Sequence, residues 1–544
     1  MIRSHWKTTW LATVCLLALA APVAQAASEP AAQVLPRELG KPEEDLRLDI
    51  RAYQVDGLPE ASAEAIAAVT ARYTGTGKGY EDVMNAATAV TRYMQRELGY
   101  YVGFAYVPEQ QPKDGVVRLQ ALEGRLDRID IAGDGGEASE AERALIARQL
   151  ASLKPGEILR TDEVERAVLL LNDLRGLSIK VEVEEGRQPG TAALRVSSRA
   201  ESAWAWRLEA DTLGNRYTGL ARVSAAVSTA GVLQVGDALT AQVLSSHTGG
   251  LKQGSLGYVV PVGAQGLRLG GVLSRVEYAV DRFDFPAAYR GTVDVAGAYG
   301  LYPLVRSRNL NLFGLLSYEH KDFDDRQTGL ALSKRSGDWI LGMVGDSRDA
   351  WLGGGINTFE LQALQGRMHY GAGANPLGLD RRFDKVTLGA ARLQSIVPGR
   401  LQLYARYKAQ LSGTSLDATE RYAAGGPTGV RAFEPGEAAA DTAHVVNAEL
   451  RWLPPESIFG KTARELVFSA FYDWAHVKFF HDESLQSFGV DNTGRLSAAG
   501  IGMIWERVGN FSVRMDLAWR GQGDALADPK DDEPRVNLVL SKRF

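Results

Sequence analysis

The segment LQLYARYKAQL, residues Leu401–Leu411, decides the fold class of this chain. Apolar, alanine and tyrosine side chains fill its odd-numbered positions, and Gln, Tyr, Arg and Lys fill the even-numbered ones. The segment FSVRMDLAW, Phe511–Trp519, alternates in the same way. Because successive side chains of a β-strand point to opposite faces, each segment predicts a strand with one apolar and one polar face. A soluble β-sandwich also alternates, so the connections between strands must separate the two classes.

The connections alternate between long and short toward the C-terminus. The long ones are Ser412–Ala443, Lys478–Gly494 and Gly521–Pro534, and the shorter ones are Leu453–Glu465 and Val508–Asn510. Outer-membrane barrels combine long external loops with short periplasmic turns. After the N-terminal apolar run, no apolar stretch reaches the roughly 20 residues of a membrane-spanning helix, and lipid offers no partner to an unpaired backbone group. We therefore predict an all-β transmembrane barrel over residues 200–544.

The length of this region predicts the size of the barrel. At about 21 residues for each strand with its connection, it holds about sixteen antiparallel strands. Such a barrel encloses a lumen that is either open or plugged, and outer-membrane lipid surrounds it. The chain ends inside a predicted strand, at Phe544. We expect this terminal aromatic residue to be the C-terminal signal that barrel assembly machinery reads.

Two small α+β domains are expected before the barrel, over residues 46–124 and 125–199. Each has the order β-α-α-β-β. In the first domain, a helix over Glu81–Leu98 has one apolar face, made by Val83, Ala87, Val90 and Met94. In the second, Ser139 and Glu142 have the spacing of a capping box. A further helix begins at Thr161, ends at Gly176 and turns Val164, Ala167, Val168 and Leu171 inward.

The first 26 residues have the pattern of a secretory signal peptide: a positive start, about a dozen apolar residues and an A-x-A end at Ala24–Ala26. Cys15 lies in this segment and is the only cysteine, so the mature chain has no disulfide and no thiolate metal site. Residues 27–45 form a short N-terminal segment. Its three prolines disfavour a long helix, and the sequence leaves open whether a plug helix precedes the first domain.

Other classes of function find little support in the sequence. The net charge is −5 and no basic run contains interleaved aromatic residues, so no nucleic-acid partner is expected. The histidines are scattered without an H-E-x-x-H motif, and Gly353–Gly355 lacks the Lys and Ser/Thr of a phosphate loop. We expect no catalytic residue, no metal site and no cofactor.

Several segments resemble the TpsB family, the outer-membrane transporters of two-partner secretion, also called hemolysin secretion/activation proteins. The resemblance extends over nearly the whole mature chain. The segments are Gly99–Val102, Val107–Gln110, Asp114–Val116, Leu122–Arg125, Leu169–Leu174, Gly214–Gly219, Gly236–Asp237, Tyr302–Arg308 and Asp346–Arg348. The resemblance implies that the two α+β units are POTRA domains, which bind an unfolded client in the periplasm.

The sharpest match is in Gly425–Phe433. It resembles the family's VRG[YF] motif, which the resemblance places on the tip of a long loop that folds back into the pore. The residues concerned are Gly429, Val430, Arg431, Ala432 and Phe433. A companion F-x-D-x-G motif on the inner barrel wall corresponds to Phe471, Asp473 and Ala475. The resemblance implies that the arginine pairs with the aspartate. The chain departs from both motifs at one position, since Ala432 and Ala475 replace glycine.

Strand parity supports this assignment independently. In Leu466–His476 the even positions form an apolar and aromatic set suited to lipid, so Phe471, Asp473 and Ala475 are expected to face the lumen. Counting back from Phe544, the loop that carries Arg431 is the sixth external loop. Without the resemblance, a solvated loop with an ordinary surface arginine is an equally good reading.

The expected function is export of a large secreted exoprotein of adhesin or hemolysin type through the outer membrane, after its capture by the POTRA domains. Strand addition to an open sheet edge is a suitable mode of capture, because backbone hydrogen bonds demand little of the client's sequence. The alternative is a factor that inserts other barrels into the outer membrane, although such factors commonly carry more POTRA domains. A passive porin is disfavoured by the two preceding domains. The identity of the client, the oligomeric state and the resting state of the pore stay open.

Overall fold

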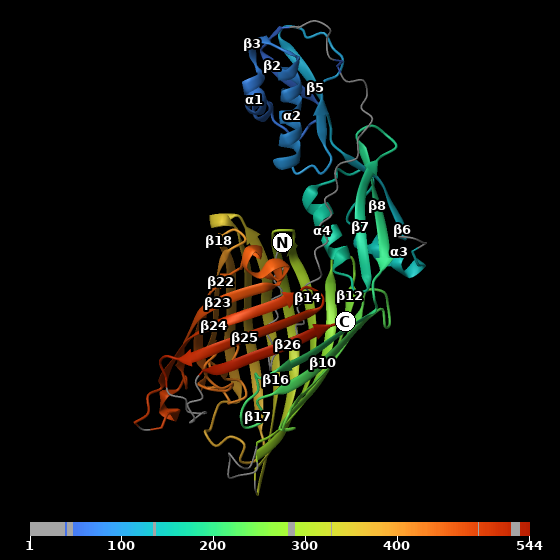
Figure 1. Ribbon diagram of the computed structural model, residues 1–544. Helices are drawn as coiled ribbons and strands as arrows, with labels where there is room; N and C mark the ends of the chain where they lie inside the picture. The colour runs from blue at the N-terminus through green and yellow to red at the C-terminus, as the bar shows by residue number, and fades with distance from the viewer. Residues whose placement is uncertain are drawn as a thin grey trace. The chain divides into compact units, whose positions relative to one another are not determined.

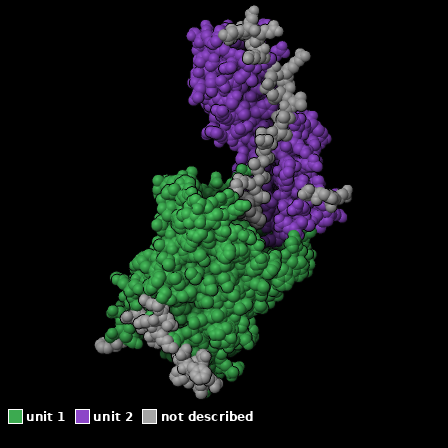
Figure 2. Space-filling view, viewed as in Figure 1, with its two compact units in different colours: residues 1–20, 202–262, 266–544 green, residues 21–201, 263–265 purple. Residues whose placement is uncertain are grey.

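The computed structural model describes residues 39–40, 47–133, 138–280, 289–327, 329–487, 489–523 and 534–544. The chain divides into two compact units (Figure 2). One holds the described residues up to Glu201 together with residues 263–265, and the other holds residues 202–262 and the chain from Gly266 onward. The signal peptide predicted for residues 1–26, and residues 27–45 except Leu39 and Gly40, lie outside the described residues.

The first α+β domain has two helices against a small mixed sheet (Figure 1). Its elements are β1 (Leu48–Ile50), β2 (Ala52–Asp56), α1 (Ala63–Thr70), η1 (Ala71–Tyr73), β3 (Gly75–Lys78), α2 (Tyr80–Arg96), β4 (Phe104–Tyr106) and β5 (Val116–Leu122). The main sheet has the order β2-β5-β4, in which β5 is parallel to β2 and antiparallel to β4. The four residues predicted for the apolar face of α2 are all buried in the core.

The second domain repeats this arrangement. Its elements are β6 (Arg125–Gly133), α3 (Glu140–Gln149), α4 (Thr161–Asn172), β7 (Leu177–Glu185) and β8 (Thr191–Ala200). The order β6-β8-β7 again places the last strand in the middle, parallel to the first and antiparallel to the second. The capping box is present: the Ser139 hydroxyl accepts from the Glu142 N–H at 3.2 Å, and the Glu142 carboxylate accepts from the Ser139 N–H at 2.8 Å.

Two details of α4 differ from the prediction. The helix ends at Asn172, before Gly176, and Leu170 is buried where Val168 was expected to be. The segment from Val168 to Leu171 is apolar at every position, so a period of 3.6 residues cannot decide which of its side chains faces the sheet.

The barrel is closed and antiparallel, and the described residues supply sixteen strands, as predicted (Figure 1). These are β9 (Trp204–Asp211), β10 (Arg222–Ala230), β11 (Ala238–Ser246), β12 (Leu251–Val262), β13 (Leu267–Ala279), β14 (Tyr289–Arg306), β15 (Leu310–Gln327), β16 (Leu330–Asp349), β17 (Gly355–Tyr370), β18 (Arg382–Val397), β19 (Leu401–Ser412), β22 (Thr442–Trp452), β23 (Leu466–Lys478), β24 (Thr493–Arg507), β25 (Phe511–Arg520) and β26 (Arg535–Arg543). Pairing of β26 with β9 closes the ring. Strands β14, β15 and β16 contain 18, 18 and 20 residues, more than the roughly ten that a bilayer requires.

The two ends of the barrel are named here by the start of β9. This strand begins at Trp204, shortly after β8 ends at Ala200, so the end where β9 begins is the proximal end and the opposite end is the distal one. Since the strands alternate in direction, every second connection is distal. The connection 413–441 is the sixth of these, in agreement with the prediction. The alternation of long and short connections is weaker in the first half of the barrel, where β15 ends at Gln327 and β16 already begins at Leu330.

Aromatic side chains gather toward both ends of the outer wall. Trp204, Trp206, Trp452, Trp505 and Phe544 lie near the proximal end, and Tyr318, Trp339 and Trp519 lie toward the distal end, all of them exposed. Exposed Leu, Val and Ile side chains lie between them. An apolar belt between two aromatic girdles is the outer surface of a transmembrane barrel. Among the described residues, no helix is both long and apolar enough to cross a membrane.

Candidate functional site

The connection 413–441, the lumen loop hereafter, crosses the interior of the barrel. It contains the two short strands β20 (Tyr422–Ala423) and β21 (Ala439–Ala440), which pair with each other. Ion pairs tie it to the wall: Glu420 with Lys321 of β15 (3.0 Å) and Lys385 of β18 (2.8 Å), and Glu434 with Arg535 of β26 (2.8 Å). Because β15 and β26 stand on opposite sides of the closed ring, a segment that contacts both must lie in the lumen.

Arg431 makes a buried polar contact between the loop and the wall. Its Nε and Nη2 donate to Oδ2 and Oδ1 of Asp473, both at 2.8 Å, and its backbone N–H donates to Oδ2 at 3.1 Å. Arg431 is 3% exposed and Asp473 is 0% exposed. The structure therefore brings together the two residues that the family resemblance paired, in the bidentate geometry in which an arginine–carboxylate contact is strongest.

The Phe471 ring packs against the Arg431 guanidinium. The Arg431 Cζ lies 3.4 Å from the centre of the Phe471 ring, which is close enough for a cation–π contact. On the neighbouring strand β24, Gly500 stands directly opposite Phe471 in the register. A Cβ atom on Gly500 would lie 2.2 Å from Phe471 Cζ. The absence of a side chain at Gly500 thus makes room for the ring on which Arg431 rests.

Side chains from three wall strands complete a charge cluster around Arg431. Glu449 of β22 accepts from Arg431 Nη1 at 2.8 Å, and it also contacts Arg451 and Arg514, while Arg514 contacts Asp516. Together with Asp473, the cluster has three guanidinium groups and three carboxylates. The charges therefore balance in an environment where an unpaired charge would be costly.

Asn447 of β22 joins the same network through both ends of its amide. Its Nδ2 donates to Asp473 Oδ1 at 2.7 Å and to the Gly429 carbonyl at 2.8 Å, and its Oδ1 accepts from Arg406. Sequence reasoning missed Asn447 and Glu449. Both follow the parity of β22, in which the exposed residues Val446, Leu450 and Trp452 occupy the alternate positions, so the pattern used for β23 would have identified them.

The other motif residues form the apolar part of the contact. Val430, Ala432, Phe433, Phe471 and Ala475 belong to one buried cluster. A Cβ atom on Gly429 would lie 1.9 Å from the Ala424 carbonyl oxygen, so the loop can close only with glycine there. Ala432 and Ala475, which replace the glycines of the family motifs, are 2% and 0% exposed. Both methyl groups are accommodated while the loop stays against the wall.

The remaining sequence-selected residue, Phe544, lies far from this cluster. Its side chain is 68% exposed, and its backbone N–H donates to the Trp206 carbonyl of β9 at 3.1 Å. The C-terminus therefore extends the pairing that closes the barrel. Elsewhere in the part of the chain that the structure describes, no group of three or more His, Cys, Asp or Glu side chains could hold a metal ion.

A second polar site joins the two α+β domains. Arg160, at the N-terminus of α4, donates to the Leu98 carbonyl at 2.9 Å and to Glu60 at 2.7 Å. Its guanidinium also lies over the ring of the buried Tyr100, and burial raises the pKa of Tyr100 to about 12. The backbone N–H groups of Thr161 and Tyr101 donate to Gly99 and Leu159 at 2.8 Å. Arg160 thus links both domains through hydrogen bonds and a ring contact.

The fold and the site define the class of protein: a sixteen-stranded outer-membrane barrel with two α+β domains before it and a loop bound inside it. Residues 190–501 match the family model described as haemolysin secretion/activation protein ShlB/FhaC/HecB, and residues 48–124 match a POTRA domain of ShlB type. The first match covers more than half of the chain. This chain belongs to the haemolysin secretion/activation family, the outer-membrane transporters of two-partner secretion.

Individual relatives agree with this assignment. The chain is 23% identical over 471 residues to the heme/hemopexin transporter protein HuxB of Haemophilus influenzae, covering 84% of this chain and 81% of the relative. It is 24% identical over 398 residues to the outer membrane transporter CdiB of Dickeya dadantii, covering 71% and 69%. Among solved structures, CdiB from Escherichia coli superposes with a TM-score of 0.70 at 17% identity, covering 95% of this chain and 94% of that one.

A wider similarity is limited to the fold. BamA from Haemophilus ducreyi, lacking POTRA domains 1–3, superposes with a TM-score of 0.53 at 13% identity, covering 92% of this chain and all of that one. The family match favours secretion over the assembly-factor alternative. The family is one of transporters and secretion pores, and it is not an enzyme family. The POTRA domains are periplasmic, so the proximal end of the barrel faces the periplasm and the distal end faces the outside.

Proposed function

We propose that the two POTRA domains capture an unfolded exoprotein of adhesin or hemolysin type, and that the client passes through the barrel when the lumen loop leaves its site on the wall. This division assigns capture to residues 46–124 and 125–199 and passage to residues 200–544, after removal of residues 1–26. Outer-membrane lipid and the barrel assembly machinery, which would read Phe544, are the further partners of the proposal.

One observation carries the role of the loop: it is held in the lumen by contacts on opposite sides of the ring. Val430, Phe433 and Ala424 are fully buried there, and ion pairs fix the loop to β15, β18, β23 and β26. An extended polypeptide needs a water-filled path of its own. Passage of a client therefore requires the loop to move, and Arg431 with Asp473 supplies the main polar contact that must break.

Charged groups make much of the contact between the loop and the wall, and this suits a contact that opens. Water and the polar backbone of an entering client can replace the partners of a charged group, whereas an apolar plug would gain nothing from them. The balanced cluster around Arg431 is stable as a whole, but loss of one member leaves its partner unpaired. The loop is thus held firmly at rest and can be released without unfolding the barrel.

The POTRA sheets offer a mode of capture. In each domain the last strand occupies the centre, so the two other strands, β2 and β4 or β6 and β7, form the edges. An edge strand exposes backbone N–H and C=O groups to which an extended client can add. No nucleotide motif accompanies the domains, so folding of the client outside the cell supplies direction to the export.

Removal of the first POTRA domain tests the capture step. Deleting residues 46–124 leaves the pairing of the barrel strands untouched, so the protein should reach the outer membrane and yet fail to export its partner. Cell fractionation locates the barrel, and immunoblotting of the medium measures the exported partner. Normal secretion by the truncated protein would exclude a role of this domain in capture.

A further inference from the structure

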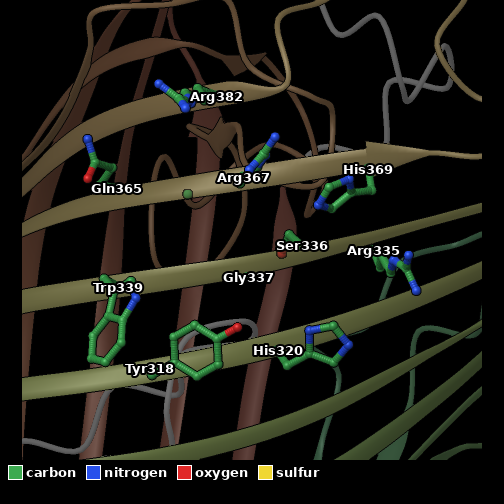
Figure 3. Close-up of a pocket in the computed structure, with 11 residues that line it drawn as sticks. Tyr318, His320, Arg335, Ser336, Gly337, Trp339, Gln365, Arg367, His369 and Arg382 are labelled. Atoms are coloured by element: carbon green, nitrogen blue, oxygen red, sulfur yellow. The ribbon is translucent and has the colours of Figure 1, made fainter.

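The outer wall of the barrel has a basic depression toward its distal end. Residues of β15, β16, β17 and β18 line a shallow pocket of about 550 Å³, and those at its basic edge include Arg335, Arg367 and Arg382 (Figure 3). All three arginines are exposed. They face outward, because the lumen-facing residues Ser336, Met368 and Phe383 beside them are buried. This surface takes no part in the lumen site.

The strand register places these residues together. Arg367 stands directly opposite Arg382, and on its other side it stands opposite Gly337, which is opposite His320. Arg335 is two residues from Gly337 and stands opposite His369. Direct cross-strand neighbours lie about 5 Å apart and diagonal ones about 7–8 Å. Three guanidinium groups and two imidazoles therefore share one small surface.

Gly337 produces the hollow at the centre of this surface. It interrupts the row between His320 and Arg367, and a Cβ atom there would lie 2.7 Å from the Tyr318 hydroxyl. The acidic residue Asp322 stands directly opposite Arg335 in the register, and its carboxylate contacts His320 at 3.3 Å. Within the described residues, no hydrogen bond or ion pair holds the side chains of Arg335, Arg367 and Arg382. Their charges are thus available to a ligand.

The position of the arginines relative to the membrane identifies the kind of ligand. Along the same strands, the exposed apolar residues Leu316, Leu341 and Leu361 come first, and Tyr318 with Trp339 follows, their rings 4.9 Å apart. Figure 3 shows this ring pair, with Arg335 and the histidines farther along the strands. The sequence runs from hydrocarbon to aromatic girdle to basic cluster. The arginines therefore lie at the level of the lipid head groups in the outer leaflet.

The outer leaflet of a Gram-negative outer membrane consists of lipopolysaccharide, whose lipid anchor carries phosphate on a disaccharide. Arginine matches phosphate through two parallel hydrogen bonds. We infer that Arg335, Arg367 and Arg382 form a binding site for the phosphorylated disaccharide of this glycolipid. Its acyl chains lie against the apolar residues below the Tyr318–Trp339 pair. Bound lipid fixes the barrel wall at β15 and β18, the strands whose inner faces hold Glu420 of the lumen loop.

Binding is measured with the purified full-length protein in a neutral detergent. Fluorescent bisphosphorylated lipid A is titrated against the parent and against the triple variant R335Q/R367Q/R382Q. The matched control is R275Q, since Arg275 is also an exposed arginine of the outer wall but already contacts Glu277 and Asp294 at 3.1 and 3.2 Å. The triple variant should bind at least about tenfold more weakly, and the R275Q variant should bind like the parent.

Two further arms separate the lipid from other anions. Lipid A from which both phosphates have been removed should bind the parent about tenfold more weakly, and excess inorganic phosphate should not displace the intact lipid. Binding of the triple variant within about twofold of the parent, equal binding of the phosphate-free lipid, or displacement by inorganic phosphate would each overturn the inference. Since no client is present in the assay, its failure would leave the proposed export function untouched. Circular dichroism verifies that each variant is folded.

Discussion

Arg431 rests on the face of Phe471, with its guanidinium carbon 3.4 Å from the ring centre, while two of its nitrogens hold Asp473 two residues farther along the same strand. One strand thus supplies both an aromatic surface and a carboxylate to a single arginine of the lumen loop. Asn447 from the neighbouring strand fixes the carboxylate from the other side. The position of the loop depends on this combination.

The first prediction concerns the ion pair itself. The R431A and D473A variants should each impair secretion, and the double variant should be much less than additive, because either single change already breaks the contact. Loss of one partner of a fully buried pair costs about 3–5 kcal/mol, against about 0–1 kcal/mol for an exposed pair. Secretion assays on the two single variants and the double variant complete the double-mutant cycle. Fractionation verifies that each variant is inserted in the membrane. Additive losses would show that the two residues do not act together.

The second prediction concerns conductance. The purified protein should conduct in planar bilayers, and deleting residues 425–437 should increase its conductance, because the segment fills part of a lumen that sixteen strands enclose. The R431A variant should open more often than the parent, without reaching the conductance of the deletion. A conductance that the deletion leaves unchanged would mean that the loop lies outside the lumen in the membrane.

The third prediction concerns Gly500. A G500A substitution should displace the Phe471 ring and weaken its contact with the Arg431 guanidinium. The new Cβ atom would lie 2.2 Å from Phe471 Cζ and 2.2 Å from the Leu517 carbonyl oxygen. We expect the G500A variant, like R431A, to open more often than the parent in planar bilayers. The matched control is G257A in β12, where the nearest atom to the new Cβ atom would be 3.7 Å away. Equal behaviour of the two variants would remove Gly500 from the site.

The fourth prediction concerns the junction of the POTRA domains. An R160A substitution removes the contacts with Glu60, Leu98 and Tyr100, so it should increase proteolytic cleavage between the domains and reduce secretion. Lys154 is the control, because its ion pair with Glu157 is 3.4 Å long and largely exposed. K154A should therefore behave like the parent. Unchanged cleavage of the R160A protein would show that the junction does not depend on this arginine.

Strand parity and connection lengths were enough to predict the barrel, its size and the inward direction of Asp473, because a period of two fixes the face of every residue once one is known. The contact with Arg431 required the family resemblance, since nothing in the loop sequence says where a long connection folds. The same parity argument, applied to β22, could have predicted that Asn447 and Glu449 face the lumen. The ion pairs of Glu420 with Lys321 and Lys385 could not be predicted in this way, because they join the lumen loop to wall strands that are distant from it in the sequence.

The account depends most on movement of the lumen loop, and a reversible cross-link between the loop and the wall measures this directly. Glu420 and Lys385 are in contact at 2.8 Å, and the mature chain expected after signal cleavage contains no cysteine, so an E420C/K385C variant can be bridged with a short reducible bismaleimide. Each single-cysteine variant, treated in the same way, is the control. We expect bridging to stop export of the partner and reduction to restore it, whereas the reagent should not change the export that each single-cysteine variant shows without it. Undiminished export through the bridged protein would contradict the claim that the loop must leave the wall.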